Sequence, residues 1–347
     1  MSNLPWTSGC LSAWSASRTV RIGSIFAAVL LAPVGGNGQA IEDGDWSVPR
    51  TSAGHPVLQG HWTNSTVIPL QRPEELGEKA FYTEEELDEF TSERLEITHT
   101  TPGTSADVHY KLEDFGLDRS QNTVAVNRRT SILFDPPNGR LPEPTAEARE
   151  FVAAQRAWRA EHGYDSAQNR PLAERCVIWP HEGPPTIPVG YNSNFQIMQT
   201  DEHVVILIEM LHDARIIPLT DTPALPEGVP QWLGDSQGHW DGDTLVVETT
   251  GFRGDTSIWS TGGVPVSTDA LITERFTRTS DDSILYEFTV DDPANWTQPW
   301  SGEYAMARID GPMFEYACHE GNYGLVNTLS GQRYEEQRAA EQEAAAR

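Results

Sequence analysis

The sequence has few cysteines, few basic residues and none of several short motifs that mark cofactor-dependent enzymes. It contains 3 cysteines, and its 24 lysines and arginines stand against 51 aspartates and glutamates, for a formal net charge of −27. It has no P-loop, no Gly-x-Gly-x-x-Gly and no Cys-x-x-Cys-His. ATP, a Rossmann-bound nicotinamide and covalent haem are therefore disfavoured. An acidic surface repels nucleic acid and anionic lipid, so we expect neither as a partner.

Long apolar runs are also scarce, and the one that stands out lies near the N-terminus. Arg18 and Arg21 precede "IGSIFAAVLLAPVGG", and small residues then offer a cleavage point after Ala40. This order is typical of a secretory signal, and the run is shorter than the roughly twenty residues of a membrane span. We predict a signal peptide over residues 1–40, a periplasmic or secreted protein, and no membrane insertion. Loss of two arginines and no acid takes the net charge to about −29.

The cysteines are few enough to suggest one pair. Cys10 leaves with the signal, and Cys176 and Cys318 remain in a chain bound for an oxidising compartment. Thiols pair there, so we predict a Cys176–Cys318 disulfide. The alternative is two buried free thiols.

Short β runs separated by acidic turns dominate the chain after residue 170. The runs are "FQIMQT", "VVILIEML", "ARIIPL", "TLVVETTGF", "ALITERFTRT", "ILYEFTV", "EYAMARI" and "MFEYACHE". This spacing predicts an antiparallel meander. We expect a mainly β fold in which that meander, over 171–330, is closed or strongly curved into a barrel-like core. A strand-, helix- and loop-rich N-terminal wrap would cover 41–170, and a polar helical tail 331–347.

Two helices and two strands are expected within the wrap. A capping box at Thr83 and Glu86 predicts one helix, and Thr145 can cap a second that runs to about residue 162. One strand is expected over 58–70, and a short strand that runs into a Pro-Pro-Asn-Gly turn is expected over 130–140. One stripe of the second helix carries apolar side chains, namely Phe151, Ala154 and Trp158.

Several long motifs resemble a large, uncharacterised group of secreted or periplasmic bacterial proteins. They are "GHWTNSTVIPLQRP", "RTSILFDPPNGRLP", "HDARIIPL", "WLGDSQGHWDGDTLVVETTGF", "ERFTR", "DDPANWTQPW" and "EYACHEGNYG". The resemblance spans nearly the whole chain after the signal, and it implies a shared secreted fold without a particular activity. The Gly60-x-Trp62 pair is also similar to the start of lipocalin barrels.

Three histidines are the first candidates for chemistry, because each lies beside an acid near the end of a β run. Histidine titrates near neutrality, and a carboxylate can orient its ring. A barrel rim could bring the three together, as proton carriers with orienting acids, an anion- or enolate-binding arginine and a tyrosine donor. The candidate catalytic residues are His212, His239, His319, Asp213, Glu320, Arg215 and Tyr323.

The same three histidines could instead hold a divalent metal, as an open three-imidazole site does. The sequence has no His-Glu-x-x-His and no His-x-His, so no local spacing supports metal. We therefore expect no cofactor, with a divalent metal on His212, His239 and His319 as the alternative.

Acidic residues inside the β runs form a second candidate set. In an extended run Glu287 lies on the face opposite Tyr286 and Phe288, and Glu209 shares a face with Arg215. The water-facing side of a barrel predicts this alternation, and we favour that interpretation. The alternative places these acids in a polar lumen with Arg215 or Arg275 as the cationic partner.

Aromatic and amide side chains form the third set. The sequence has 11 tryptophans, and loop tryptophans suit stacking on sugars or aromatic ligands, although they equally serve as lids over a core. Trp232 and Trp259 are among those in the loops. The candidate substrate-binding residues are Tyr191, Asn192, Asn194, Trp240, Trp296 and Trp300.

Together these features predict a barrel-like protein that binds a small apolar, aromatic or sugar-like molecule. Side-chain acid–base chemistry would transform that molecule, as in a cofactor-independent lyase, isomerase or hydrolase. The alternatives are a non-catalytic periplasmic small-molecule-binding protein, a histidine-coordinated metal enzyme and a structural component of the cell envelope.

Overall fold

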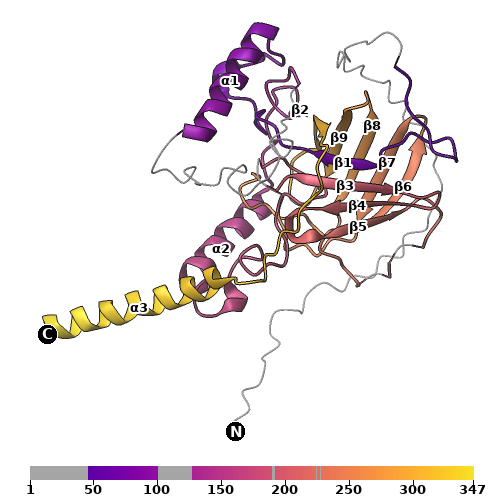
Figure 1. Ribbon diagram of the computed structural model, residues 1–347. Coiled ribbons are helices and arrows are strands. Elements are labelled where there is room, and N and C mark those ends of the chain that lie inside the picture. The colour runs from indigo at the N-terminus through magenta and orange to yellow at the C-terminus, as the bar shows by residue number, and fades with distance from the viewer. Residues whose placement is uncertain (1–45, 101–126, 190–191, 224, 227, 259) are drawn as a thin grey trace. The chain divides into compact units, whose positions relative to one another are not determined.

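The computed structural model describes residues 46–100, 127–189, 192–223, 225–226, 228–258 and 260–347, without the side chains of 93–100 and of His212 (Figure 1). The signal peptide expected over 1–40, the candidate Tyr191 and the loop residue Trp259 lie outside the described residues. Within the described part, no helix is long and apolar enough to cross a membrane.

The ten described strands belong to one antiparallel sheet, as expected. Its order is β5-β4-β3-β1-β10-β9-β8-β7-β6, and β2 pairs with β10 beside that path. The strands are β1 (Gly60–Thr63), β2 (Leu133–Asp135), β3 (Asn194–Gln199), β4 (His203–Ile208), β5 (Ala214–Pro218), β6 (Asp235–Asp241), β7 (Thr244–Thr250), β8 (Leu271–Arg278), β9 (Ser283–Asp291) and β10 (Trp300–Arg308).

The two ends of this order, β5 and β6, lie side by side without pairing as strands. Gln237 of β6 instead donates through Nε2 to the carbonyl oxygen of Pro218, at 3.2 Å, and to that of Thr220. A Cβ atom at Gly238 would lie 2.8 Å from Ile217 Cγ2, so only glycine permits this approach. The sheet is thus a nearly closed barrel, and we call the unpaired β5–β6 junction the seam.

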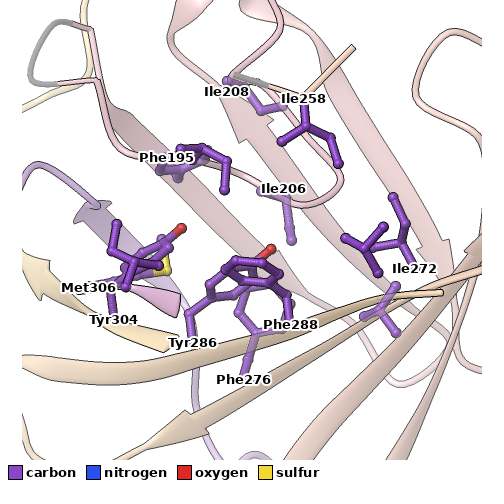
Figure 2. Packing of buried hydrophobic residues seen from close by; sticks show 14 of the residues in the cluster. Phe195, Ile206, Ile208, Ile258, Ile272, Phe276, Tyr286, Phe288, Tyr304 and Met306 are labelled. Carbon is purple, nitrogen blue, oxygen red and sulfur yellow. The ribbon is translucent and has the colours of Figure 1, made fainter. Parts of the chain in front are cut away.

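The barrel interior is apolar along most of its length. Buried and outward side chains alternate along β8 and β9, as the period of a strand requires. Figure 2 shows side chains from facing parts of the barrel pointing toward one another, among them Phe195, Ile206, Ile272, Tyr286, Phe288 and Met306. Each such side chain stabilises the fold by roughly 1.5 to 3 kcal/mol when fully buried.

Trp62 closes part of this interior from β1. Its side chain is fully buried, its indole N–H donates to the carbonyl oxygen of Leu58 at 2.8 Å, and the guanidinium of Arg278 lies 5.5 Å from the centre of its ring. Because β1 pairs with both β3 and β10, the N-terminal segment contributes a strand to the middle of the sheet.

The described helices are α1 (Glu84–Thr100), α2 (Ala146–His162) and α3 (Tyr323–Ala346), with short 3-10 turns η1 (Glu74–Leu76), η4 (Ala167–Asn169) and η5 (Met210–His212). The predicted caps are confirmed. Thr83 and Glu86 bond reciprocally at 3.2 and 2.8 Å, and the Thr145 hydroxyl accepts from the N–H of Ala148 at 3.1 Å. The stripe on α2 is not a core face, however, because Phe151 and Trp158 are 43% and 44% exposed.

Several elements differ from the predicted ones. Residues 313–320 are not a strand, and β6 forms where no β run was expected. The strand expected over 58–70 covers only 60–63, and the tail helix begins at Tyr323 instead of 331. The apolar alternation of 313–320 misleads because this segment has no strand partner. Phe314 is 43% exposed, and the segment packs on the core through Tyr316 and Cys318.

The predicted Cys176–Cys318 disulfide is confirmed. It joins the segment after β10 to the loop before β3, across 142 residues of chain. Asn322 reinforces this junction, because its Nδ2 donates to the carbonyl oxygen of Glu174 at 3.0 Å and to Cys176 Sγ at 3.4 Å. The disulfide therefore anchors the start of α3 to the same loop.

Candidate functional site

A pocket of about 270 Å³ opens along the seam. β5 supplies one wall, and the segment that leads into β6 supplies the other. Its lining mixes polar side chains with apolar ones. The polar ones are Asp213, Arg215, Gln231, Asp235 and Ser236, and the apolar ones are Val177, Ala214, Ile216, Trp232 and Leu233. We call it the seam pocket.

Arg215 runs from the seam pocket into the barrel interior and is only 4% exposed. Its Nη1 donates to Glu274 Oε1 at 3.0 Å, and its Nη2 donates to Glu274 Oε2. Burial alone would lower the pKa of Arg215, but the Glu274 carboxylate outweighs burial and raises it. Nη2 also reaches the Ser236 hydroxyl at 3.3 Å, whereas Nε is buried without a hydrogen-bond partner.

The Tyr286 hydroxyl extends this network by donating to Glu274 Oε1 at 2.8 Å. Burial raises the pKa of Tyr286 well above its ordinary value, and the Glu274 charge adds to the effect. Tyr286 in turn accepts from the N–H of Thr186 at 3.1 Å, while the Thr186 hydroxyl bonds the Tyr304 hydroxyl at 2.6 Å. The loop over 177–187 thus reaches the inward-facing polar groups of the barrel.

That loop also carries Glu182, whose side chain is fully buried. Its Oε1 accepts from the N–H of Trp179 at 2.7 Å, and Asp213 is its charged hydrogen-bonding neighbour. Burial, helped by Asp213, raises the pKa of Glu182 to about 9, so the carboxyl is protonated at neutral pH. A carboxyl group that is protonated at neutral pH thus lies beside a second carboxyl group, that of Asp213, which lines the seam pocket.

His181, the residue beside Glu182, is buried as well. Burial lowers the pKa of His181 to about 4, so the imidazole is neutral at physiological pH. Its neutral ring adds no charge to the surroundings of Glu182.

The structure places the predicted catalytic residues in different parts of the chain. Asp213 and Arg215 line the seam pocket together. His239 is exposed on the outer side of β6, and His319 and Glu320 are exposed in the segment after β10. Tyr323 is 74% exposed at the start of α3. The side chain of His212, which ends η5, lies outside the described residues.

The predicted substrate-binding residues have mostly structural surroundings. Asn194 is buried, and its Nδ2 donates to Glu209 Oε2 at 2.8 Å, while the Asn192 amide bonds the same carboxyl. Burial raises the pKa of Glu209, and these amide contacts oppose the rise. Both asparagines therefore hydrogen-bond the Glu209 carboxyl group. Glu209 lies inside the fold and not on its water-facing side.

The predicted tryptophans act as core or lid side chains. Trp296 and Trp300 are buried and pack edge to face, with ring centres 5.8 Å apart. Trp240 stacks on His55 at 4.9 Å. Trp232, by contrast, lines both the seam pocket and a second pocket of about 150 Å³ that also contains Trp179 and Phe252. We call the second one the aromatic pocket.

Among the described residues, no three His, Cys, Asp or Glu side chains form a group that could hold a metal ion. Arg275, the alternative lumen cation, lies outside the barrel and pairs with Asp241 at 3.0 Å, both partly exposed. Arg215 does face the lumen, as one of the two interpretations expected, but its partner is Glu274.

Sequence reasoning missed Glu182, Glu274 and Ser236. Glu274 had a readable signal, since it alternates with Ile272 and Phe276 on the apolar face of "LITERF". Ser236 lies in "GDSQG", which has the Gly-x-Ser-x-Gly spacing of a nucleophile elbow. The context does not fit an elbow: Ser236 is inside β6, no helix follows it, and its hydroxyl bonds Thr249 Oγ1 at 2.9 Å.

Comparisons with models of protein families, with curated proteins and with solved structures found no match for this chain.

Proposed function

We propose that the protein binds a small organic molecule in the seam pocket and moves a proton on it through Asp213 and Glu182. The observation that carries the proposal is the pairing of a pocket-lining carboxylate, Asp213, with a buried protonated carboxyl, Glu182. Environments that separate the protonation of two neighbouring carboxyls are typical of acid–base sites.

The chemistry follows from the two protonation states. Asp213 accepts a proton from the substrate. The protonated Glu182 carboxyl group stabilises the Asp213 carboxylate through a hydrogen bond. The pair returns the proton to another atom of the substrate in an isomerisation, or to a leaving group in an elimination. No diffusible cofactor is required.

An exported location belongs to the same proposal. The Cys176–Cys318 disulfide supports an oxidising compartment, and the N-terminal pattern of arginines, apolar run and small residues supports a signal peptide. A reaction without a diffusible cofactor suits the periplasm or the extracellular medium.

The test is proton exchange, because it requires no knowledge of the final product. The protein is incubated in D₂O with a panel of small hydroxy-carbonyl compounds, and loss of C–H signals is followed by NMR. We expect exchange with wild type and a loss of at least about 100-fold in Asp213→Asn. Asp241→Asn, an exposed carboxylate outside the seam pocket, serves as the matched control.

Two results would count against the proposal. Equal exchange in wild type and Asp213→Asn would remove Asp213 from the chemistry. A compound that binds the seam pocket without exchange or any other change would favour the alternative, a non-catalytic binding protein.

A further inference from the structure

The aromatic pocket is separate from the carboxyl groups used in the proposed function. Among the described residues that line the two pockets, Trp232 is the one they share, and neither Asp213 nor Glu182 lines the aromatic pocket. Its walls come mainly from the loop over 171–184 and from the segment over 252–258. A ligand in the aromatic pocket would therefore be held by a different set of side chains from a ligand at the seam.

Most of the residues that line the aromatic pocket are apolar. Its charged residues are Arg159 and Asp255, which are both exposed, and Asp255 already pairs with Arg253 at 3.3 Å. The apolar ones include three aromatic side chains and several aliphatic ones, among them Trp179, Trp232, Phe252, Leu172, Ile258 and Val266. The pocket therefore suits an apolar group of a ligand.

The aromatic side chains of this pocket differ in how far they are covered. Phe252 is buried, whereas Trp179 and Trp232 are half-buried. The two indoles thus keep apolar surface in contact with water, and a ligand in the pocket would cover part of it. Covering apolar surface is favourable, and aromatic rings gain further from edge-to-face or offset contacts with one another. An aromatic ring therefore gains more in this pocket than a saturated ring of the same size.

The pocket is also fixed in size and shape. Its volume is about 150 Å³, and an engineered apolar cavity of about 150 Å³ binds benzene, so the pocket has room for one ring. The Cys176–Cys318 disulfide anchors the loop over 171–184, and just beyond that loop the Thr186 N–H donates to the Tyr286 hydroxyl inside the barrel. A ring that enters a preformed pocket does not have to order its walls.

We infer that the aromatic pocket binds a single aromatic ring, so that its ligands are monocyclic aromatic compounds. The ring packs against Trp179, Trp232 and Phe252, and the aliphatic side chains of Ile258 and Val266 complete its surroundings. This site goes beyond the proposed function and does not depend on it.

Matched alcohols test the class of ligand. Benzyl alcohol carries an aromatic ring, cyclohexylmethanol carries a saturated ring of similar size, and 1-naphthalenemethanol carries two fused aromatic rings. Binding is measured by ligand-observed NMR titration. We expect benzyl alcohol to bind at least about twofold more tightly than cyclohexylmethanol, because of its contacts with the aromatic walls. 1-Naphthalenemethanol should bind no more tightly than benzyl alcohol, because its second ring finds no room in the pocket.

Variants and ligand contacts locate the binding. Ala173→Phe fills the pocket and Trp179→Ala removes one of its walls, so each should weaken binding of benzyl alcohol at least about tenfold. Trp158→Ala removes an exposed tryptophan outside both pockets and is the matched control. Circular dichroism checks that each variant folds. In wild type, intermolecular NOEs from benzyl alcohol to the methyl groups of Ile258 and Val266 should place the ring without any substitution.

The inference would be overturned by absence of benzyl alcohol binding to wild type, or by tighter binding of either other alcohol. Equal binding of cyclohexylmethanol, or unchanged binding in folded Ala173→Phe and Trp179→Ala, would also overturn it. Asp213→Asn separates the inference from the proposed function, because this variant should lose proton exchange and keep its affinity for benzyl alcohol. Proton exchange without ring binding would leave the proposed function standing and remove the inference, and ring binding without proton exchange would do the reverse.

Discussion

Arg215 and Glu274 are 59 residues apart in the sequence and form a fully desolvated ion pair inside the barrel. Arg215 belongs to β5, at one side of the seam, while Ser236, Thr249 and Glu274 belong to β6, β7 and β8 on the other. Because β5 and β6 share no strand pairing, this guanidinium replaces part of the missing ladder. One side chain therefore both closes the barrel and lines the candidate site.

The first prediction concerns that ion pair. Glu274→Gln leaves the Arg215 charge buried without its carboxylate, and we expect a loss of about 3 to 5 kcal/mol in the free energy of unfolding, measured by urea titration. Asp241→Asn breaks the partly exposed pair with Arg275 and should cost less than about 1 kcal/mol. Equal costs for the two variants would contradict the assignment of Arg215 as the closure of the seam.

The second prediction concerns Gly238, where β6 approaches β5. A methyl group there would meet Ile217 Cγ2 at 2.8 Å and Leu219 Cδ2 at 3.0 Å, so Gly238→Ala should force the strands apart and cost about 1 to 3 kcal/mol. Gly331→Ala adds a methyl group in open space on α3 and should be neutral or stabilising. If thermal unfolding shows no difference between the two variants, the seam is wider than described.

The third prediction concerns the disulfide. Replacing Cys176 and Cys318 together with serine removes a cross-link that spans 142 residues, and we expect a loss of about 2 to 5 kcal/mol in unfolding free energy. Wild type in reductant should match the double variant. A double variant as stable as the oxidised wild type would show that the link does not restrict the unfolded chain.

The fourth prediction concerns pH and Glu182. The pKa is raised from 4.5 to about 9 in the folded state, so between these values the folded protein holds one proton more than the unfolded chain. The free energy of unfolding should therefore fall as pH rises, by at most about 1.4 kcal/mol per pH unit. His181 acts in the opposite direction between its lowered pKa of about 4 and its ordinary value of 6.5, so pH 7 to 9 isolates Glu182.

Glu182→Gln should flatten this slope between pH 7 and 9, as measured by urea unfolding at several pH values. Glu320→Gln replaces an exposed glutamate and is the matched control. A variant with the slope of wild type would show that Glu182 is ionised in the folded protein, and the acid–base pair would then lack its proton.

Local patterns predicted much of the β architecture. The alternation in "ILYEFTV" correctly placed Tyr286 and Phe288 inside and Glu287 outside. β6 was missed because its inward positions are Ser236 and Gly238, which carry no apolar signal; its place comes from pairing with β7.

The candidate site was only partly predictable. Asp213 and Arg215 stood out through their position at a strand start, but their partners Glu182 and Glu274 lie 31 and 59 residues away. Such pairs follow from barrel closure and from the path of the loop over 177–187, neither of which a local pattern encodes. Exposed histidines beside acids, such as His239 and His319, produced the same local signal without a shared site.

The central claim is that the seam pocket holds the ligand, and equilibrium dialysis tests it most directly. Wild type, Asp213→Ala and Asp241→Ala are dialysed against one metabolite extract, and the retained small molecules are identified by mass spectrometry. We predict that wild type and Asp241→Ala enrich the same compound and that Asp213→Ala loses it. Equal enrichment by all three proteins, or enrichment by none, would contradict a ligand site at the seam.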